Sequence, residues 1–370
     1  MTTAMTGTEG QQPTAQAGPC LASELTLAHS LAAVRIENEA LSATVLAGKG
    51  ADIYELTYKP RGIDVLWKSP WGLKDPAHSA PTSHDSQTAW LSYYPGGWQG
   101  IFPNGGAACK YQGVELGFHG EASLVPWDYE IVEPGGDAAE VRFSVRLFHS
   151  PFRLERTLRV EAGRPVLTVR ERIANEGGMP LDFMWGHHPA FGAPFISGAC
   201  HIDIGATTFC ADDLAAGTYN PAEPGACFPW PMGERNGRQT DMSQVPGPET
   251  PRDIMAYFRD FEAGWYGITN RDLGFGVGLV WPKEVFPYAW FWQEMHASAG
   301  FPWYRGVYVM AIEPFTSFPG QGLLNVMAKT GTHRTLGPGE SVDVEFRAVF
   351  YEAHDGIERI NPDGKAVVRG

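Results

Sequence analysis

Residues 342–350 read VDVEFRAVF, in which apolar and polar side chains alternate with a period of two. The same alternation occurs in residues 141–147, VRFSVRL, and in residues 167–173, LTVRERI. Successive side chains of a strand point to opposite faces, so this period is typical of antiparallel strands with one buried face. The three segments together predict a sheet that has one apolar side.

The remainder of the chain also favours strands over helices. There are 44 Gly and 29 Pro residues, which supply the many turns that short strands need. Helical patterns are limited to single turns near 212–216 and 354–358, and the Gly- and Pro-rich stretch 205–255 predicts long loops. Because no glycine-rich fingerprint follows a strand, a Rossmann fold is excluded. We predict an all-β protein: a disordered segment at 1–22, then one large antiparallel twisted β-sandwich over 23–370.

Composition narrows the classes of partner. A net charge of −14 argues against nucleic acid or an anionic membrane, since both require clustered Lys and Arg. No apolar stretch is long enough to span a bilayer, and no secretory signal is recognisable. The cysteines are five, an odd number without a C-x-x-C spacing, which argues against a disulfide framework or a zinc site. We therefore expect a cytoplasmic protein in a reducing compartment.

Two segments carry side chains suited to acid–base chemistry. Residues 185–191 read WGHHPAF, and residues 307–313 read VYVMAIE, an apolar strand face that ends on Glu313. A histidine and a carboxylate can act as general acid and general base if the fold brings them together. Strand alternation points His187 and His188 to opposite faces, and Pro189 keeps the backbone of His188 extended. Each segment also has a structural interpretation: Glu313 could face solvent or pair with an arginine, and each histidine could be satisfied by a backbone carbonyl.

A third histidine completes a recognisable order of motifs. The segments Phe118-His119-Gly120 with Trp127, His188-Pro189-Ala190-Phe191, and Glu313-Pro314 follow one another along the chain. In this order they resemble the aldose 1-epimerase (galactose mutarotase) superfamily, of which the chain looks like a divergent member. The opening Gly50-Ala51-Asp52-Ile53 is also similar to that superfamily, and the resemblance covers roughly residues 30–352.

The resemblance implies a fold and a reaction. The fold would be the galactose mutarotase-like supersandwich, with the site on a concave sheet face. Glu313 would take the proton from the anomeric hydroxyl, His188 would protonate the ring oxygen, and His119 would hydrogen-bond near the same oxygens. No metal and no organic cofactor would be needed, and the partner would be a small sugar.

The chain departs from the superfamily in the residues that hold the sugar. Members carry an arginine upstream of the first histidine, whereas no arginine occurs here between Arg61 and Arg142. Gln99 or Asn104 could donate hydrogen bonds in its place. The family's substrate-binding aspartate has no clear match among Asp241, Asp253 and Asp260.

Aromatic residues supply further candidates for contact with a sugar. The segment 287–293, PYAWFWQ, resembles the family's strand that places a tryptophan before the glutamate. Trp290 or Trp292 could stack on a sugar ring or pack in the core. His187 is a further candidate for binding, with a structural role as its alternative.

Three functions follow from these observations. The first is interconversion of the anomers of an aldose or modified aldose by ring opening at C1. The second is a non-catalytic carbohydrate-binding protein on the same fold. The third is a cupin-like metal enzyme with His119, His187, His188 and Glu313 as ligands, although adjacent histidines should point apart. The oligomeric state stays open.

Overall fold

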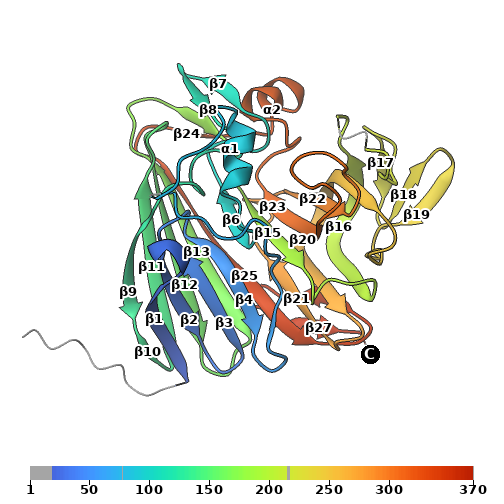
Figure 1. Ribbon diagram of the computed structural model, residues 1–370, viewed down its shortest axis with the longest axis horizontal. Helices are drawn as coiled ribbons and strands as arrows, with labels where there is room; N and C mark the ends of the chain where they lie inside the picture. Colours follow the sequence, from blue (N-terminus) through green and yellow to red (C-terminus); the bar gives the residue numbers. More distant parts are fainter. Residues whose placement is uncertain (1–18, 77, 215–216, 370) are drawn as a thin grey trace, which may run out of the picture.

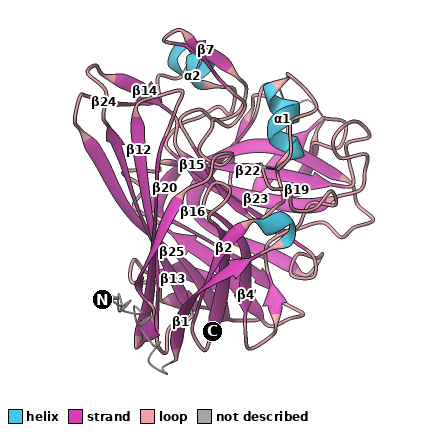
Figure 2. Cartoon of the chain, turned by 60° about the vertical axis from the view of Figure 1, so that its left-hand side comes forward, coloured by secondary structure: helices cyan, strands magenta, loops and turns pink. Residues whose placement is uncertain are grey.

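The structure is a computed structural model that describes residues 19–76, 78–214 and 217–369 (Figure 1). Antiparallel strands make up most of it, and 19 of them belong to one continuous sheet. The predicted all-β class is confirmed, and Figure 2 shows how few helices accompany the strands. In the described part of the chain, no helix is long and apolar enough to cross a membrane.

One layer contains the three alternating segments. Its strands, in spatial order, are β9 (Asp128–Glu133), β11 (Ala138–Arg146), β12 (Phe152–Glu161), β13 (Val166–Asn175), β25 (Ser341–Glu352) and β21 (Phe275–Val280). The alternation predicted one buried face, and Val141, Phe143, Val169 and Phe346 on that face are at most 2% exposed. Burial of these side chains is the main force that holds the layer against its neighbour.

The second layer carries the candidate residues. Its strands, in spatial order, are β1 (Cys20–Thr26), β2 (Ala32–Glu37), β3 (Leu41–Leu46), β4 (Asp52–Tyr58), β6 (Trp98–Ile101), β15 (Gly186–Gly192), β23 (Tyr308–Phe315) and β22 (Tyr288–Met295). The long strand β20 (Arg252–Asn270) pairs first with β22 and then with β21, so it joins the two layers. Strand β16 (Cys200–Ala211) pairs along the same β20.

Apolar side chains fill the space between the layers. Trp98 of β6 contacts Phe346 of β25, and Tyr58 of β4 contacts Phe350 of the same strand. A second apolar cluster lies on the other face of β6, β15, β23 and β22, and includes Trp90, Tyr94, Trp290 and Phe315. The candidate site is embedded in this second cluster.

Short elements surround these layers. They are η1 (Ala28–Ser30), β5 (Ile63–Asp64), α1 (Ser86–Ser92), β7 (Cys109–Tyr111), β8 (Val114–Leu116), β10 (Gly135–Gly136), β14 (Leu181–Phe183), β17 (Cys227–Pro229), β18 (Met232–Arg235), β19 (Arg238–Asp241), α2 (Leu323–Lys329), β24 (Arg334–Leu336), β26 (Ile357–Ile360) and β27 (Ala366–Val368).

Three expectations about local structure need correction. Residues 20–22 lie in β1 and not in an unstructured segment, while residues 1–18 lie outside the described ranges. The stretch 205–255 includes much of β16, then β17, β18 and β19, so it is less loop-like than its composition indicates. Helical turns were expected near 212–216 and 354–358. Residues 212–214 are not helical, and 215–216 lie outside the described ranges. In the second segment, strand β26 begins at Ile357.

Helix α1 was missed because its signal is local and short. Asp85 precedes it, and its carboxylate accepts a hydrogen bond from the backbone N–H of Thr88 at 2.7 Å. This N-cap satisfies one of the free N–H groups of the first turn. A helix of seven residues offers too few turns for an apolar period to stand out.

One disulfide forms, although the cysteine pattern argued against a disulfide framework. Cys210 and Cys227 are bonded and are direct cross-strand partners in β16 and β17, with their Cα atoms 4.0 Å apart. Their spacing along the chain did not reveal this, because strand register brings them side by side. Cys20, Cys109 and Cys200 are free.

Candidate active site

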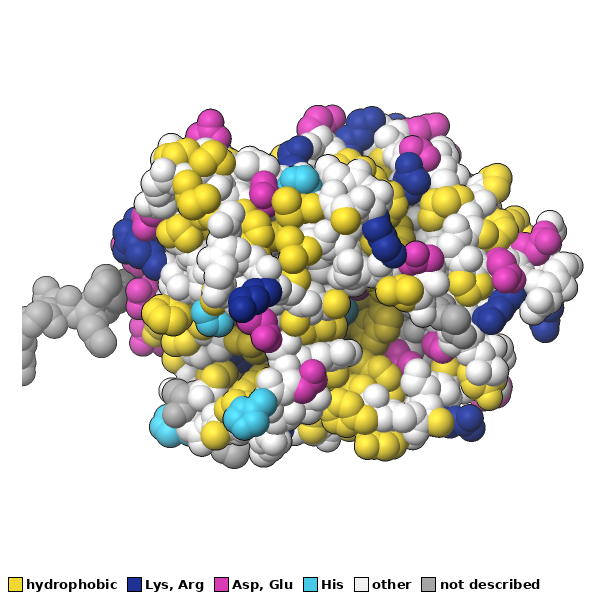
Figure 3. All heavy atoms as spheres, turned by 90° about the horizontal axis from the view of Figure 1, so that it is seen from above, with side chains coloured by type: hydrophobic (Ala, Val, Ile, Leu, Met, Phe, Trp, Pro, Cys, Tyr) yellow, Lys and Arg dark blue, Asp and Glu magenta, His cyan; other side chains and the backbone are white. Residues whose placement is uncertain are grey.

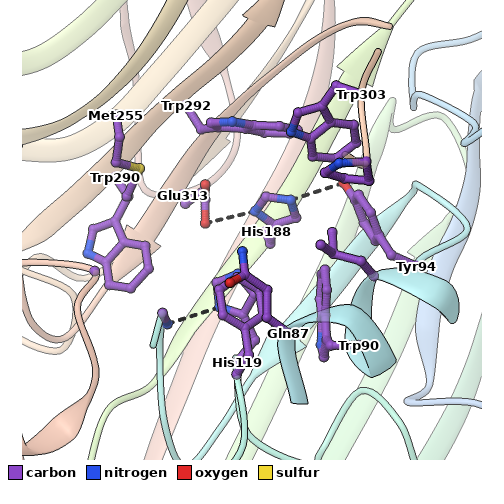
Figure 4. Close-up of a pocket in the computed structure, with 15 residues that line it drawn as sticks. Gln87, Trp90, Tyr94, His119, His188, Met255, Trp290, Trp292, Trp303 and Glu313 are labelled. Atoms are coloured by element: carbon purple, nitrogen blue, oxygen red, sulfur yellow. Dashed lines mark hydrogen bonds and ion pairs between the residues drawn. The ribbon is translucent and has the colours of Figure 1, made fainter. Parts of the chain in front are cut away.

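His188 and Glu313 lie opposite each other on neighbouring strands. In the ladder of β15 and β23, Gly186 pairs with Phe315 and Ala190 with Ala311, which sets His188 across from Glu313. Residues opposite each other in an antiparallel pair point their side chains to the same face. Nδ1 of His188 is 2.9 Å from Oε2 of Glu313, and both side chains are buried (Figure 4).

The contact between the two groups leaves hydrogen-bonding capacity unused. Among the described residues, neither Nδ1 of His188 nor Oε2 of Glu313 has an aligned hydrogen-bond partner, although the atoms are close. Buried polar atoms are nearly always satisfied in folded proteins, and the exceptions mark strain, a catalytic role, or a bound water or ion. The two facing atoms thus lie close together without an aligned hydrogen bond, and both residues belong to the cavity lining.

Tyr94 is the third member of this group, and the sequence did not point to it. Its hydroxyl lies 3.0 Å from Nε2 of His188 (Figure 4). Burial, followed by the negative charges of Glu313 and Asp52, raises the pKa of Tyr94 well above 10, so the phenol keeps its proton. A phenol can both donate and accept, so Tyr94 can hold the imidazole in either protonation state of His188. The signal available was the aromatic density of residues 90–94, WLSYY.

His119 enters the cavity from a tight turn. Its backbone has a φ of 59°, and its Nδ1 accepts the N–H of Gly106 at 3.1 Å. With Nδ1 accepting, the proton of the neutral ring is on Nε2. Burial, and then the nearby His188, lowers the pKa of His119 well below 6.5. His119 is thus a neutral hydrogen-bond donor rather than a proton source.

Gly106 makes this arrangement possible. Its φ is +77°, and a Cβ there would be 1.8 Å from the carbonyl oxygen of Gly320. Only glycine allows so close an approach of two backbones at a positive φ. The turn can therefore place its N–H on the ring of His119.

The cavity has a volume of about 270 Å³ and mostly aromatic walls. The ring of Trp292 lies 5.5 Å from that of His188, and Trp290 stacks on Phe315 at 3.6 Å. Figure 3, seen from above, shows a recess in this face lined mainly by hydrophobic side chains. The lining contains no Lys or Arg and one carboxylate; it consists of Gln87, Trp90, Leu91, Tyr94, Gly106, Phe118, His119, His188, Met255, Trp290, Trp292, Pro302, Trp303, Glu313 and Gly320.

His187 points to the opposite side of β15, as strand alternation predicted. Its Nε2 lies 3.1 Å from Oε2 of Glu171, and its Nδ1 accepts from the indole N–H of Trp98 at 3.3 Å. It packs between the layers against Phe346 and does not line the cavity. Its place as a substrate-binding candidate is therefore corrected to a structural one.

A buried ion pair supports His187 from behind. Nε of Arg156 donates to Oε1 of Glu171 at 2.5 Å, and both side chains are nearly inaccessible. Burial alone would raise the pKa of Glu171, but Arg156 and His187 together lower it to about 2. The chain Arg156–Glu171–His187 thus anchors the strand that carries His188.

Gln99 and Asn104 have other partners than a ligand. The Gln99 amide donates to the carbonyl of Gly96 at 2.7 Å, and Asn104 donates to the carbonyls of Ala107 and Gly117. Both are fully buried, and neither lines the cavity. Their predicted contact with substrate is corrected, because these amides satisfy loop backbone instead.

None of the three aspartates considered as candidates for contact with a sugar reaches the cavity. Asp241, Asp253 and Asp260 do not line the cavity, whereas Met255 does. A metal site of the cupin kind fails on geometry, since His187 points away from His188 and His119. Within the described ranges, no cluster of three or more His, Cys, Asp or Glu residues could hold a metal ion.

A family model described as a domain of unknown function, DUF4432, matches residues 28–348. The chain belongs to the DUF4432 family. No curated protein matches this DUF4432 sequence.

Solved structures share the fold of this DUF4432 chain. A candidate aldose 1-epimerase from Klebsiella pneumoniae aligns with a TM-score of 0.67 and 15% identity, covering 90% of this chain and 83% of that chain. A galactose mutarotase-like protein from Clostridium acetobutylicum aligns at 0.65 and 17%, covering 90% and 99%. Another from Lactobacillus casei aligns at 0.59 and 14%, covering 86% and 100%. The galactose mutarotase-like fold inferred from the three motifs is therefore confirmed.

The lowered pKa of His119 predicts a pH-dependent stability for the DUF4432 protein. The unfolded chain binds a proton at His119 below pH 6.5, whereas the folded chain does not, so stability falls as the pH drops below 6.5. This group alone contributes a slope of up to about 1.4 kcal/mol per pH unit. In urea unfolding between pH 7.5 and 5.5, H119Q should show a flatter dependence than the wild type. Parallel curves for the two proteins would contradict the burial of a neutral His119.

Proposed function

We propose that this protein is an acid–base isomerase that interconverts the anomers of an uncharged aldose. The observation that carries the proposal is the placement of His188 and Glu313 opposite each other. They share one buried, aromatic-lined cavity, and their facing polar atoms lack aligned partners. The shared fold with galactose mutarotase-like proteins supports the same chemistry.

The reaction can be written with the residues of the cavity. Glu313 removes the proton of the anomeric hydroxyl while protonated His188 gives its Nδ1 proton to the ring oxygen. The bond between C1 and the ring oxygen breaks, and C1 becomes an aldehyde carbon. After rotation about the C1–C2 bond, the former ring hydroxyl attacks the other face of C1. His188 takes its proton back, and Glu313 returns a proton to the carbonyl oxygen, so both groups are restored.

Two other groups assist without exchanging protons with the sugar. Tyr94 positions His188 through Nε2, so the proton given to the ring oxygen is the one on Nδ1, the nitrogen beside Oε2 of Glu313. His119 presents its Nε2–H to sugar hydroxyls as a neutral donor. A Trp ring can stack on the apolar face of a pyranose, and Trp292 beside His188 is placed for this.

The cavity favours a neutral sugar. With no Lys or Arg in its lining and Glu313 inside it, a phosphate or carboxylate of a sugar would be buried without a counter-charge. The arginine that mutarotase superfamily members carry is absent from this chain, and no other cation stands in its place among the described residues that line the cavity. We therefore assign hexoses, pentoses or deoxyhexoses as the substrate class, and exclude hexose phosphates and uronic acids.

Anomer exchange measured by NMR tests this proposal. We expect at least one neutral aldose to exchange faster than in buffer alone. Its 6-phosphate and its uronic acid should exchange at least about tenfold more slowly, equivalent to about 1.4 kcal/mol. Failure of every sugar to exceed the buffer rate would overturn the proposal, and calorimetric binding without exchange would point to a carbohydrate-binding protein instead.

A further inference from the structure

A second hollow borders the proposed active cavity. Its volume is about 470 Å³, larger than the 270 Å³ of the cavity itself. The two share Leu91, Pro302 and Trp303 in their linings, so Trp303 stands on the border between them. The other lining residues are Pro70, Trp71, Lys74, Thr82, Thr88, Ser92, Phe301 and Tyr304.

Aromatic side chains in this hollow are presented to solvent. Phe301 is 57% exposed and Tyr304 is 68% exposed, which is costly for large apolar groups without a partner. Trp71 lies against Trp303 with ring centres 5.9 Å apart, and its indole N–H donates to the carbonyl of Tyr94 at 2.9 Å. The aromatic surface is therefore continuous from the active cavity outwards.

The segment that bears Phe301 and Tyr304 is held in place. The buried carboxylate of Glu294 accepts from the backbone N–H groups of Ala297 and Ser298 at 3.0 and 2.9 Å. Tyr304 has a φ of 45°, an uncommon value for a non-glycine residue that the surrounding bonds must enforce. Within the turn that carries the exposed rings, the backbone N–H of Tyr304 donates to Gly300 and that of Arg305 donates to Ser298.

The hollow also offers hydrogen-bonding groups. Thr82, Thr88 and Ser92 bring hydroxyl groups to its lining. Among the described residues that line it, Lys74 is the one cation and there is no Asp or Glu. Aromatic faces combined with hydroxyls are the chemistry that recognises a pyranose ring, which has apolar C–H faces and a polar edge. The hydroxyl of Thr88 donates to Oδ1 of Asp85 and that of Ser92 to the carbonyl of Ala89, so the lone pairs of both oxygens remain to accept from sugar hydroxyls.

We propose that this hollow binds the second ring of a reducing disaccharide whose reducing ring occupies the cavity at His188 and Glu313. The inference rests on the proposed function for the first ring, and adds a binding site for the second. Trp303 then contacts both rings, and Phe301 and Tyr304 contact only the second. Adding a second ring to the sugar should therefore raise kcat/KM for anomer exchange without altering the chemistry at C1.

Matched pairs of sugars test the second site. The best neutral monosaccharide is compared with reducing disaccharides that end in it, by NMR exchange at the reducing end. We expect kcat/KM to be about threefold to tenfold higher for at least one disaccharide. The double variant F301A/Y304A should abolish that advantage while leaving kcat/KM for the monosaccharide unchanged. The control F148A removes an aromatic side chain that is 91% exposed and lies outside both linings, and it should change neither value.

The outcomes distinguish a failure of the second binding site from a failure of the proposed function. Equal use of monosaccharide and disaccharide by the wild type, or an equal loss for both in F301A/Y304A, would overturn the second site alone. If no sugar exchanges at all, the proposed function fails, and calorimetry then decides the second site. Tighter binding of disaccharide than monosaccharide, lost in F301A/Y304A, would support it, and equal affinities would overturn it.

Discussion

Replacing Glu313 with glutamine should lower kcat for anomer exchange by about 10²–10⁴-fold, the usual contribution of a positioned general base. Glutamine has nearly the same shape but cannot take the proton of the anomeric hydroxyl. The position is buried at 2% exposure, so an isosteric change disturbs the packing around it little. Exchange rates from NMR at saturating sugar measure the effect.

The matched control for this substitution is E358Q. Glu358 is exposed and lies outside the cavity lining, so E358Q should exchange anomers at the rate of the wild type. Thermal unfolding of E313Q shows whether the fold is kept. A folded E313Q that exchanges within about threefold of the wild type would remove Glu313 from the reaction.

Replacing Arg156 with methionine should lower the free energy of unfolding by about 3–5 kcal/mol, because it leaves the carboxylate of Glu171 buried without its cation. Arg156 and Glu171 are 4% and 6% exposed, so water cannot take the place of the lost partner. The substitution also removes the hydrogen bond from Arg156 to the carbonyl of Ala51 at 2.7 Å. Urea unfolding measures the loss.

Arg172→Met is the comparison that separates burial from charge. Arg172 pairs with Asp343 at 3.0 Å, but the two side chains are 48% and 64% exposed. An exposed pair is worth about 0–1 kcal/mol, so R172M should change stability little. Similar losses of stability for R156M and R172M would show that burial does not increase the contribution of the Arg156–Glu171 pair.

The pKa of Glu171 gives a second measure of the same pair. Because the folded state lowers this pKa from 4.5 to about 2, the stabilisation is fully present above pH 4.5. It is lost as the pH falls towards 2. In R156M this part of the acid dependence should be smaller than in the wild type.

Local patterns in the sequence predicted what depends on neighbouring residues only. The period of two in 342–350 identified a strand because alternation is a property of the extended backbone itself. The same rule separated His187 from His188, and the structure places them on opposite sides of β15. The order of the three motifs was enough to identify the fold.

The hydrogen-bond and disulfide partners of individual side chains could not be predicted from local patterns. Gln99 and Asn104 looked available for a sugar, but their amides satisfy backbone groups that only the folded loops bring near. Tyr94 follows a short helix with no apolar period, and the aromatic density of residues 90–94 did not single it out as the residue that bonds His188. The disulfide between Cys210 and Cys227 depends on strand pairing in the same way.

The sequence by itself determined that the chain forms strands, which side each strand buries, and which side chains could carry acid–base chemistry. Only the tertiary structure decided that His188 stands across from Glu313, that His119 is neutral, and that an aromatic wall without cations surrounds them. The reason is that alternation is set by each residue's own backbone. Register, burial and cavity shape are set by contacts between residues far apart in the chain.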